Sequence, residues 1–537
     1  MTDTPTPASF SRRDALRTAA ALGLSGLGVT GLLARPVAAQ AFPAFGQALA
    51  EGVAGDSGLS AFYRETGYAP VWTGPDHANR RSALVSALSR AAEHGLPPER
   101  YELQSLIAAY HAVTSERDRG FLEARTSKTF LRYASDIGSG LLEPGRIIPQ
   151  IVRDLPRPEA AGLMRGFVAA EPVAFIRNLS PHAPEYARLF RAKRELEALI
   201  ARGGWGPRLS GSVRPGASGA QVVALRNRLI EMGYLPRIAT ASYDARMQQA
   251  VQAFQIAHGL NPNGIAEQAT VNAMNVAAED RLQSVIVALE RERWLNIPRG
   301  DRHIWVNLAD FSTQIMDEDR VTFDTVSVVG GQGGDVQTPE FSHRMTYLEI
   351  NPDWTIPRSI IARSYWNGLV NGGHRYLEII DARGNVVPRH QVRFAGFNPR
   401  NFPYEVRQPP GPTNPLGTVK FMFPNPHAIY LHDSPARSLF QTTVRTHSSG
   451  CVRLNDPEEF AYELLGRQEA DPVSFYQRIR RSGQQTRVFL DEPVPVHLVY
   501  RTAFTSADGR LNFRNDVYGR DARLYAALRQ AGVVTGV

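Results

Sequence analysis

The sequence predicts a multidomain α+β protein: a helical first part, then a three-helix module, then a mostly β part that carries an inserted subdomain. Apolar residues recur at helical spacing up to about residue 275, whereas from Arg302 onward many of them alternate with a period of two. Glycine and proline cluster between these segments, for example at 203–207. A chain of 537 residues with 43% hydrophobic content is long enough for roughly three or four domains.

Residues 1–39 are expected to be a targeting peptide rather than part of the fold. The run from Ser11 to Arg17 contains Arg12 and Arg13 and resembles a twin-arginine export motif; uncharged residues follow it up to Ala34. We predict cleavage after Ala39. A membrane anchor is the less favoured alternative, because the uncharged segment is short and rich in small residues. We therefore expect no stable membrane span after cleavage.

The formal net charge of +8 and the pI near 9.6 suit an anionic partner. A polyanionic polymer, a membrane surface and nucleic acid all meet that description. No Lys/Arg block is dense enough to indicate nucleic acid, which we therefore do not predict as a partner.

Residues 40–205 are predicted to form a helical scaffold without chemistry of its own. Leu84, Leu88 and Ala91 follow helical spacing, and a further helix is expected near 129–134. The aromatic stretch 62–72 is more typical of packing at a helix end than of a ligand platform.

Residues 209–277 predict a compact module of three short helices. Val222, Leu225 and Leu229 mark the first helix, Val251 and Phe254 the second, and 267–275 the third. A segment of this kind is more typical of a binding module than of an enzyme.

Residues 300–500 are expected to be mostly β, with strands at 303–308, 321–329, 345–351, 419–423 and 428–432. Between them, 357–412 is too long and too rich in Gly, Pro and Asn for a simple connection, so it predicts an inserted subdomain. Trp354 lies near its start. Residues 501–537 are expected to form a hairpin and a helix that pack on this β domain, with the hairpin closing its sheet.

Cys451 is the only cysteine in the sequence, and small residues precede it. A lone thiol in an exported chain cannot form an internal disulfide, and the flexible Ser449-Gly450 step is typical of a presented nucleophile. Such a thiol needs a base, and three histidines are near in sequence. We rank them His432, which ends a predicted strand, then His447, then His427.

Several runs in the β part together resemble the L,D-transpeptidase catalytic domain of the YkuD type. In chain order they are Asn351-Pro352-x-Trp354, Asn414-Pro415-Leu416-Gly417, Lys420-Phe421-x-Phe423-Pro424-Asn425, Tyr430-Leu431-His432-Asp433-x-Pro435 and Ser448-Ser449-Gly450-Cys451-Val452-Arg453. Through Gly233-Tyr234, Tyr243-Asp244 and His258-Gly259-Leu260, the three-helix module resembles the peptidoglycan-binding domain of bacterial wall enzymes. The mature chain as a whole resembles the large periplasmic branch of the transpeptidase family, which has a scaffold and a capping subdomain.

The resemblance implies Cys451 as nucleophile, His432 as its base, the Gly450 and Cys451 amides near the oxyanion, and Arg453 as a buttress. The candidate substrate-binding residues are Trp354, Tyr430, Ser449 and His447. Many family members have histidine where this chain has Ser449, which weakens any role for a second histidine such as His447.

The implied reaction is periplasmic formation of 3→3 cross-links between tetrapeptide stems of peptidoglycan, through a thioester and without metal or organic cofactor. Carbapenem β-lactams are implied as inhibitors. Water or a lipoprotein could replace the amine acceptor, which would make the enzyme a carboxypeptidase or a wall-protein attachment enzyme.

Two alternatives come from other classes. A zinc hydrolase could use His427, His432 and either Asp433 or His447, although no His-x-x-x-His or comparable ligand spacing is present. A non-catalytic wall-binding scaffold would need no isolated thiol.

Overall fold

The computed structural model describes residues 43–506 and 508–535, so the expected targeting peptide and its cleavage point lie outside the described residues. Within these ranges, no helix is both long and apolar enough to cross a membrane.

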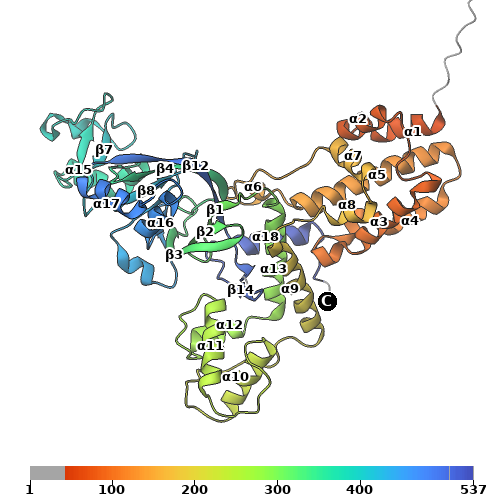
Figure 1. Cartoon of the computed structure of the whole chain (residues 1–537), viewed down its shortest axis with the longest axis horizontal. Helices are drawn as coiled ribbons and strands as arrows, with labels where there is room; N and C mark the ends of the chain where they lie inside the picture. Colours follow the sequence, from red (N-terminus) through yellow and green to blue (C-terminus); the bar gives the residue numbers. More distant parts are fainter. Residues whose placement is uncertain (1–42, 507, 536–537) are drawn as a thin grey trace, which may run out of the picture. The chain divides into compact units, whose positions relative to one another are not determined.

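The scaffold is built from helices, which run from red to orange-brown in Figure 1. Their bounds are α1 Ala44–Val53, α2 Ser57–Glu65, α3 Ala78–Ser89, α4 Leu103–Ala112, α5 Glu116–Ser139, α6 Pro144–Ile147, α7 Ala160–Ala169, α8 Pro172–Arg177 and α9 Pro184–Ala201. Glu123 on α5 is fully buried, and its carboxylate accepts hydrogen bonds from the backbone N–H groups of Val71, Trp72 and Thr73. A buried carboxylate is tolerated there because it is hydrogen-bonded, and it fixes the aromatic turn at 71–73 against α5.

The three-helix module consists of α10 Ala220–Glu231, α11 Ala245–Ala257 and α12 Gln268–Met274. Its apolar positions, including Val222, Leu229 and Phe254, pack into one small core, as their helical spacing predicts. The side chain of Arg228 is buried and donates to the backbone carbonyls of Trp205, Pro207 and Met274. It thereby ties the segment before the module to the end of α12.

Helix α13, Ala278–Trp294, was not anticipated from the sequence. Its last turns carry four consecutive charged residues, Glu290 to Arg293, all of which are buried. Each has a partner: Arg293 lies 2.9 Å from Glu290, Arg291 lies 3.1 Å from Asp521, and Arg501 contacts Glu292. Buried charges survive only when paired in this way, and the helix can therefore be enclosed all round.

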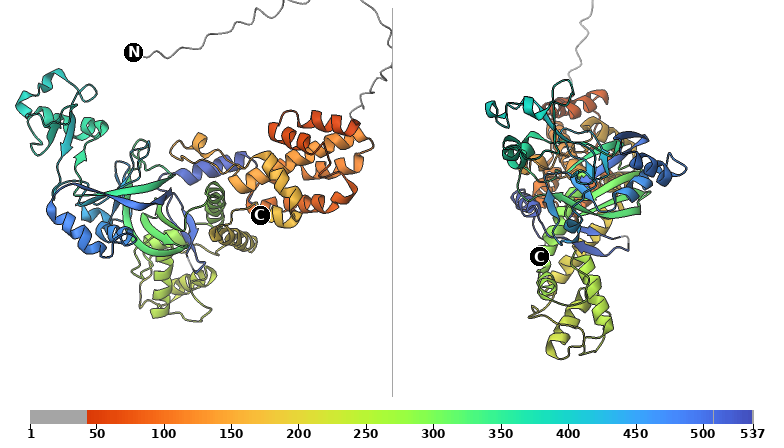
Figure 2. Two further views of the ribbon diagram at one scale, coloured as in Figure 1. Left: turned by 45° about the horizontal axis from the view of Figure 1, so that its top comes forward. Right: turned by 90° about the vertical axis from the view of Figure 1, so that its left-hand side faces the viewer.

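The β domain contains a nine-stranded sheet in the order β10-β3-β11-β9-β8-β4-β12-β1-β2. A further pairing of β2 with β3 closes this order into a ring, with β10 lying outside it on β3. The bounds are β1 Arg302–Asn307, β2 Ser312–Asp317, β3 Arg320–Gly330, β4 Phe341–Ile350, β8 Val419–Met422, β9 Leu431–His432, β10 Thr446–Ser448, β11 Val452–Leu454 and β12 Thr486–Val499. Helices α16 Pro457–Leu465 and α17 Pro472–Ser482 add Phe460, Leu464 and Tyr476 to its core (Figure 2).

The expected insertion has a core and a sheet of its own. Strands β5 Trp354–Thr355, β6 Glu378–Ile380 and β7 Glu405–Gln408 form a three-stranded sheet in the order β5-β7-β6, and α14 Arg358–Ile360 and α15 Trp366–Val370 accompany them. Trp354, Leu369, Ile379 and Phe402 are buried in this core. We call residues 357–412 the capping subdomain below.

The C-terminal segment differs from the expectation in two respects. Strands β13 Ala503–Thr505 and β14 Leu511–Phe513 pair only with each other, so the hairpin does not close the large sheet. Thr505 instead bonds Glu185 on α9 through both its N–H and its hydroxyl, and the following helix α18, Arg520–Gln530, places Leu524 and Leu528 in the scaffold core. Burial of these apolar side chains against the scaffold is what draws the tail there.

Candidate active site

The site rests on the parallel pairing of β9 with β11. Leu431 pairs with Val452 and His432 with Arg453, and the N–H of Val452 donates to the carbonyl of Tyr430 at 3.1 Å. Side chains alternate between the faces of a strand, so Leu431 and Val452 point into the core while Tyr430, His432, Cys451 and Arg453 share the opposite face. This register brings together four residues that the sequence analysis selected.

The loop before β11 is held by hydrogen bonds to side-chain hydroxyls. Gly450 has φ +129°, a conformation that residues with a Cβ rarely adopt. The Ser448 hydroxyl accepts from the Gly450 N–H at 3.1 Å and donates to the Cys451 carbonyl. The buried Thr338 hydroxyl donates to the Gly450 carbonyl at 2.6 Å and accepts from the N–H of Gly330 at 2.9 Å.

Cys451 is half-buried, and its thiol is surrounded by the segment that precedes β9. The sulfur lies 3.6 Å from the carbonyl oxygen of Ala428, to which the S–H donates. Tyr430 and Cys451 directly precede the register pair Leu431 and Val452, so they are neighbours, and Tyr430 lowers the pKa of the Cys451 thiol. No hydrogen bond joins Cys451 directly to His432 in the described part of the chain, so the two side chains have to move together before a proton can pass between them.

His432 is only 4% exposed, and its tautomer is set by its own backbone. The carbonyl of Asp433 can only accept, so Nδ1 carries the proton that is donated to it. The other ring nitrogen, Nε2, is left unprotonated in the neutral ring and can act as a base.

Burial dominates the protonation of both groups. It raises the pKa of the Cys451 thiol, an effect opposed by the hydrogen bonds from Tyr430 and by the charges of Lys420 and Arg453. Burial, followed by the same two cations, lowers the pKa of His432 to about 3. Near neutral pH the resting site therefore holds a thiol and a neutral imidazole.

A row of charged side chains crosses the sheet beside these groups. Register pairing places Arg487 opposite Glu349, Glu349 opposite Lys420, Lys420 opposite His432, and His432 opposite Arg453. Glu349 is buried and lies 3.1 Å from Lys420 Nζ and 2.9 Å from Arg487 Nη2. The row has one carboxylate and three cations, so it presents positive charge to the thiol.

The capping subdomain contacts the site through Arg363. Arg363 donates to the hydroxyl of Ser449, which directly precedes the Gly450-Cys451 pair, at 3.1 Å. Trp354, which lies just before the capping subdomain, belongs to the core against which Tyr430 packs. Trp354 itself is buried against Tyr365, with ring centroids 5.9 Å apart. Ser449 is exposed, whereas Tyr430 is half-buried.

The other selected residues lie elsewhere or are less engaged. His447 is exposed on β10, which pairs with β3 and not with β9 or β11. His427 is exposed, and its ring packs on Phe341. Arg453 is half-buried on the site face, but its side chain makes no hydrogen bond to any described residue, so no buttressing contact is seen.

Two contributors were given no role in the sequence analysis. Thr338, which lies 112 residues from Gly450, and Lys420 each belong to runs that resemble the family, but neither was selected as a site residue. Within residues 43–506 and 508–535, no three His, Cys, Asp or Glu side chains are grouped closely enough to hold a metal ion.

Comparisons with known proteins agree with this organisation. Residues 57–192 match a scaffold domain, residues 301–487 match the L,D-transpeptidase catalytic domain of the YkuD family, and residues 218–274 match a model described as "Putative peptidoglycan binding domain". A protein of Haemophilus influenzae described as "Putative L,D-transpeptidase" is 29% identical over 245 residues, which cover 45% of this chain and 49% of that protein. The match therefore spans about half the length of this curated relative.

Two solved structures also match part of the chain. An L,D-transpeptidase of Xylanimonas cellulosilytica is 15% identical and covers 55% of this chain and 100% of its own, with a TM-score of 0.18. An L,D-transpeptidase of Stackebrandtia nassauensis is 13% identical and covers 55% of this chain and 97% of its own, with a TM-score of 0.21. Both TM-scores are too low to show structural similarity. The family models match three successive segments of the chain: a scaffold domain, a peptidoglycan-binding domain and an L,D-transpeptidase catalytic domain of the YkuD type.

Proposed function

We propose that the protein is a periplasmic L,D-transpeptidase that forms 3→3 cross-links in peptidoglycan through a thioester on Cys451. The observation that carries the proposal is the placement of Cys451 and His432 on one face of two neighbouring strands, with Nε2 of His432 free to accept a proton. The matched catalytic and peptidoglycan-binding domains supply the substrate class.

The reaction begins with transfer of the Cys451 proton to Nε2 of His432. The sulfur then attacks the carbonyl carbon of the third residue in a tetrapeptide stem. The amine of the leaving D-alanine takes the proton back from His432, and a thioester remains. The side-chain amine of a second stem attacks this thioester, the new amide forms, and the Cys451 thiol is regenerated.

The oxyanion of each tetrahedral intermediate needs an N–H donor. The Gly450 N–H is bonded to Ser448, whereas the Cys451 N–H has no hydrogen-bond acceptor among the described residues. We therefore assign the donor role to the Cys451 amide and a shaping role to Gly450. Positive charge from Lys420 and Arg453 favours the same intermediate.

Cys451→Ala tests the nucleophile directly. The variant should fold normally but release no D-alanine from purified tetrapeptide stems; turnover by this variant would exclude the thioester route. His432→Gln keeps a polar side chain but no base, so it should lower turnover by about 10²-fold or more. An ordinary rate in His432→Gln would exclude His432 as the base.

Mass analysis of the products identifies the acceptor. Cross-linked dimers indicate transpeptidation, free tripeptide indicates a carboxypeptidase, and stem attached to a lipoprotein indicates wall-protein attachment. Incubation with a carbapenem should add the mass of one inhibitor to the wild-type chain and none to Cys451→Ala. A non-catalytic scaffold would show no adduct in either protein.

A further inference from the structure

Lysine is rare in this chain. Lys128, Lys193 and Lys420 are the three lysines among 60 basic residues, and arginine fills the remaining positions. Of the three, only Lys420 belongs to the catalytic domain. An ammonium differs from a guanidinium in being compact, with its charge concentrated on one atom.

The ammonium of Lys420 is held between two fixed groups. Its Nζ lies 3.1 Å from the carboxylate of Glu349 and 4.9 Å from the ring centroid of Tyr430. Glu349 is 4% exposed and is also bound by Arg487, so it cannot turn away without leaving a buried charge unpaired. Lys420 therefore has a defined position under the ring of Tyr430.

Tyr430 links this ammonium to the nucleophile. Tyr430 lies beside Cys451, because the two residues directly precede the register pair Leu431 and Val452, and its ring centroid lies 4.9 Å from the Nζ of Lys420. Lys420 is also the register partner of His432, on the strand that flanks β8 opposite Glu349. One cation thus lies beside both partners of the proton transfer.

We propose that Lys420 is a positioning residue of the active site, holding Tyr430 against Cys451 by a cation–π contact and stabilising negative charge on the sulfur. This deepens the proposed function and rests on it only for turnover, because the reactivity of the thiol can be measured without a substrate. The charge of Lys420 opposes the rise in the pKa of the Cys451 thiol that burial causes.

The other titratable or charged groups of the site belong to several elements. They are Tyr430 just before β9, His432 on β9, Arg453 on β11, Glu349 and Arg487 farther across the sheet, and Arg363 in the capping subdomain. A test of Lys420 has to leave all of these in place.

Iodoacetamide alkylation of Cys451, followed as a function of pH, provides that test. Lys420→Met removes the charge but keeps an unbranched side chain, so alkylation at pH 7 should slow by about tenfold, as expected for loss of a nearby unit charge at an effective dielectric of ~20. Lys420→Arg should restore the rate to within about threefold. The kcat for cross-linking should fall in Lys420→Met while KM stays nearly constant.

Glu349→Gln gives a change of opposite sign. It removes the only carboxylate of the row, so the sulfur experiences more positive charge and alkylation at pH 7 should become faster. General damage to the site would slow alkylation in both variants. Each of three results would overturn the proposal: slower alkylation in Glu349→Gln, no rescue by Lys420→Arg, or an unchanged pH profile in Lys420→Met. Loss of turnover in Cys451→Ala tests the function separately.

Discussion

Replacing Thr338 by valine would show how far the active site depends on one buried hydroxyl. Valine has nearly the same shape, so no cavity forms, but the N–H of Gly330 and the carbonyl of Gly450 both lose their partner. Both glycines and Thr338 are buried, so water cannot replace the bonds without opening the loop. Leaving a buried polar group unsatisfied costs about 1–3 kcal/mol. For two groups we expect Thr338→Val to lower the free energy of unfolding by about 2–6 kcal/mol.

Urea denaturation of the wild type and the variant measures this loss, and the rate of carbapenem acylation measures its effect on the nucleophile. Acylation should slow, because Gly450 directly precedes Cys451. Thr338→Ser is the matched control, since it keeps the hydroxyl and loses only a methyl group, at a cost of about 1 kcal/mol. A Thr338→Val protein as stable as Thr338→Ser, with wild-type acylation, would refute the reasoning.

Tyr430→Phe keeps the ring and removes the hydroxyl that lowers the pKa of the Cys451 thiol; a hydrogen bond to a charged group contributes about 1.5–3 kcal/mol, so acylation should slow by roughly 10- to 100-fold, and an unchanged rate would contradict this. Gly450→Ala forces a Cβ into a left-handed conformation at φ +129°, which should cost about 1–3 kcal/mol in urea denaturation; equal stability would show that the loop relaxes freely. Stability should also fall on acidification. Burial lowers the pKa of His432 and of His497 to about 3, whereas the unfolded imidazoles bind protons near pH 6.5. The unfolded state therefore binds more protons between these values, and about 2 kcal/mol per histidine should be lost from pH 6.5 to pH 5. A flat profile over this interval would contradict the assignment of neutral buried rings.

The alternation of apolar residues anticipated β1, β3 and the second half of β4, because period-two patterning follows directly from a sheet with one buried face, but it did not anticipate β2 or the 14-residue strand β12. Apolar residues at helical spacing, such as Val222 and Leu229, anticipated the helices of the small module. Helix α13 was not predicted, because the four consecutive charged residues from Glu290 to Arg293 are typical of a solvent-exposed surface. The partners that allow its burial include Asp521, far along the chain, which no local pattern can reveal.

The candidate site shows the same division between local and distant information. Cys451 and His432 stand out locally, one as a lone thiol and the other at the end of a strand. The parallel register that aligns them, and the Thr338 hydroxyl that holds Gly450, depend on tertiary contacts. The hydrogen bond between Ser448 and the Gly450 amide was likewise invisible in the motif, and it changes which N–H group remains open.

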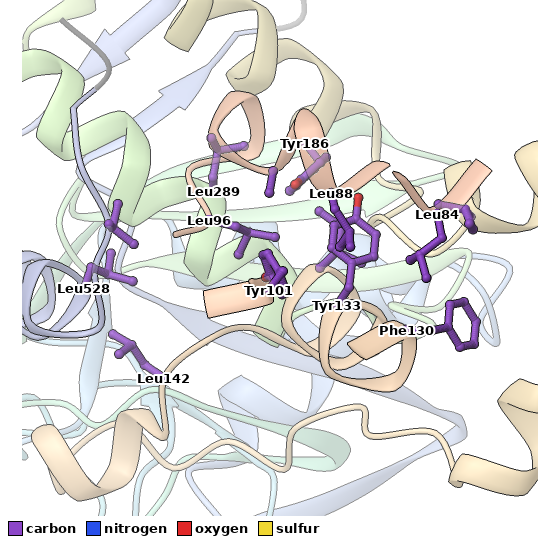
Figure 3. Close-up of a cluster of buried hydrophobic side chains, with 14 of the residues drawn as sticks. Leu84, Leu88, Leu96, Tyr101, Phe130, Tyr133, Leu142, Tyr186, Leu289 and Leu528 are labelled. Atoms are coloured by element: carbon purple, nitrogen blue, oxygen red, sulfur yellow. The ribbon is translucent and has the colours of Figure 1, made fainter. Parts of the chain in front are cut away.

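The packing of α18 into the scaffold core has a consequence for biosynthesis. Figure 3 shows Leu528 of α18 and Leu289 of α13 in one cluster with Leu96, Tyr101 and Leu142, which belong to the first third of the chain. A nascent chain emerges at about 5–20 residues per second, and its early segments wait with apolar surface uncovered until the last ones leave the ribosome. A premature stop before α18 should therefore cause aggregation through helices made long before the stop, and chaperones would be needed throughout synthesis.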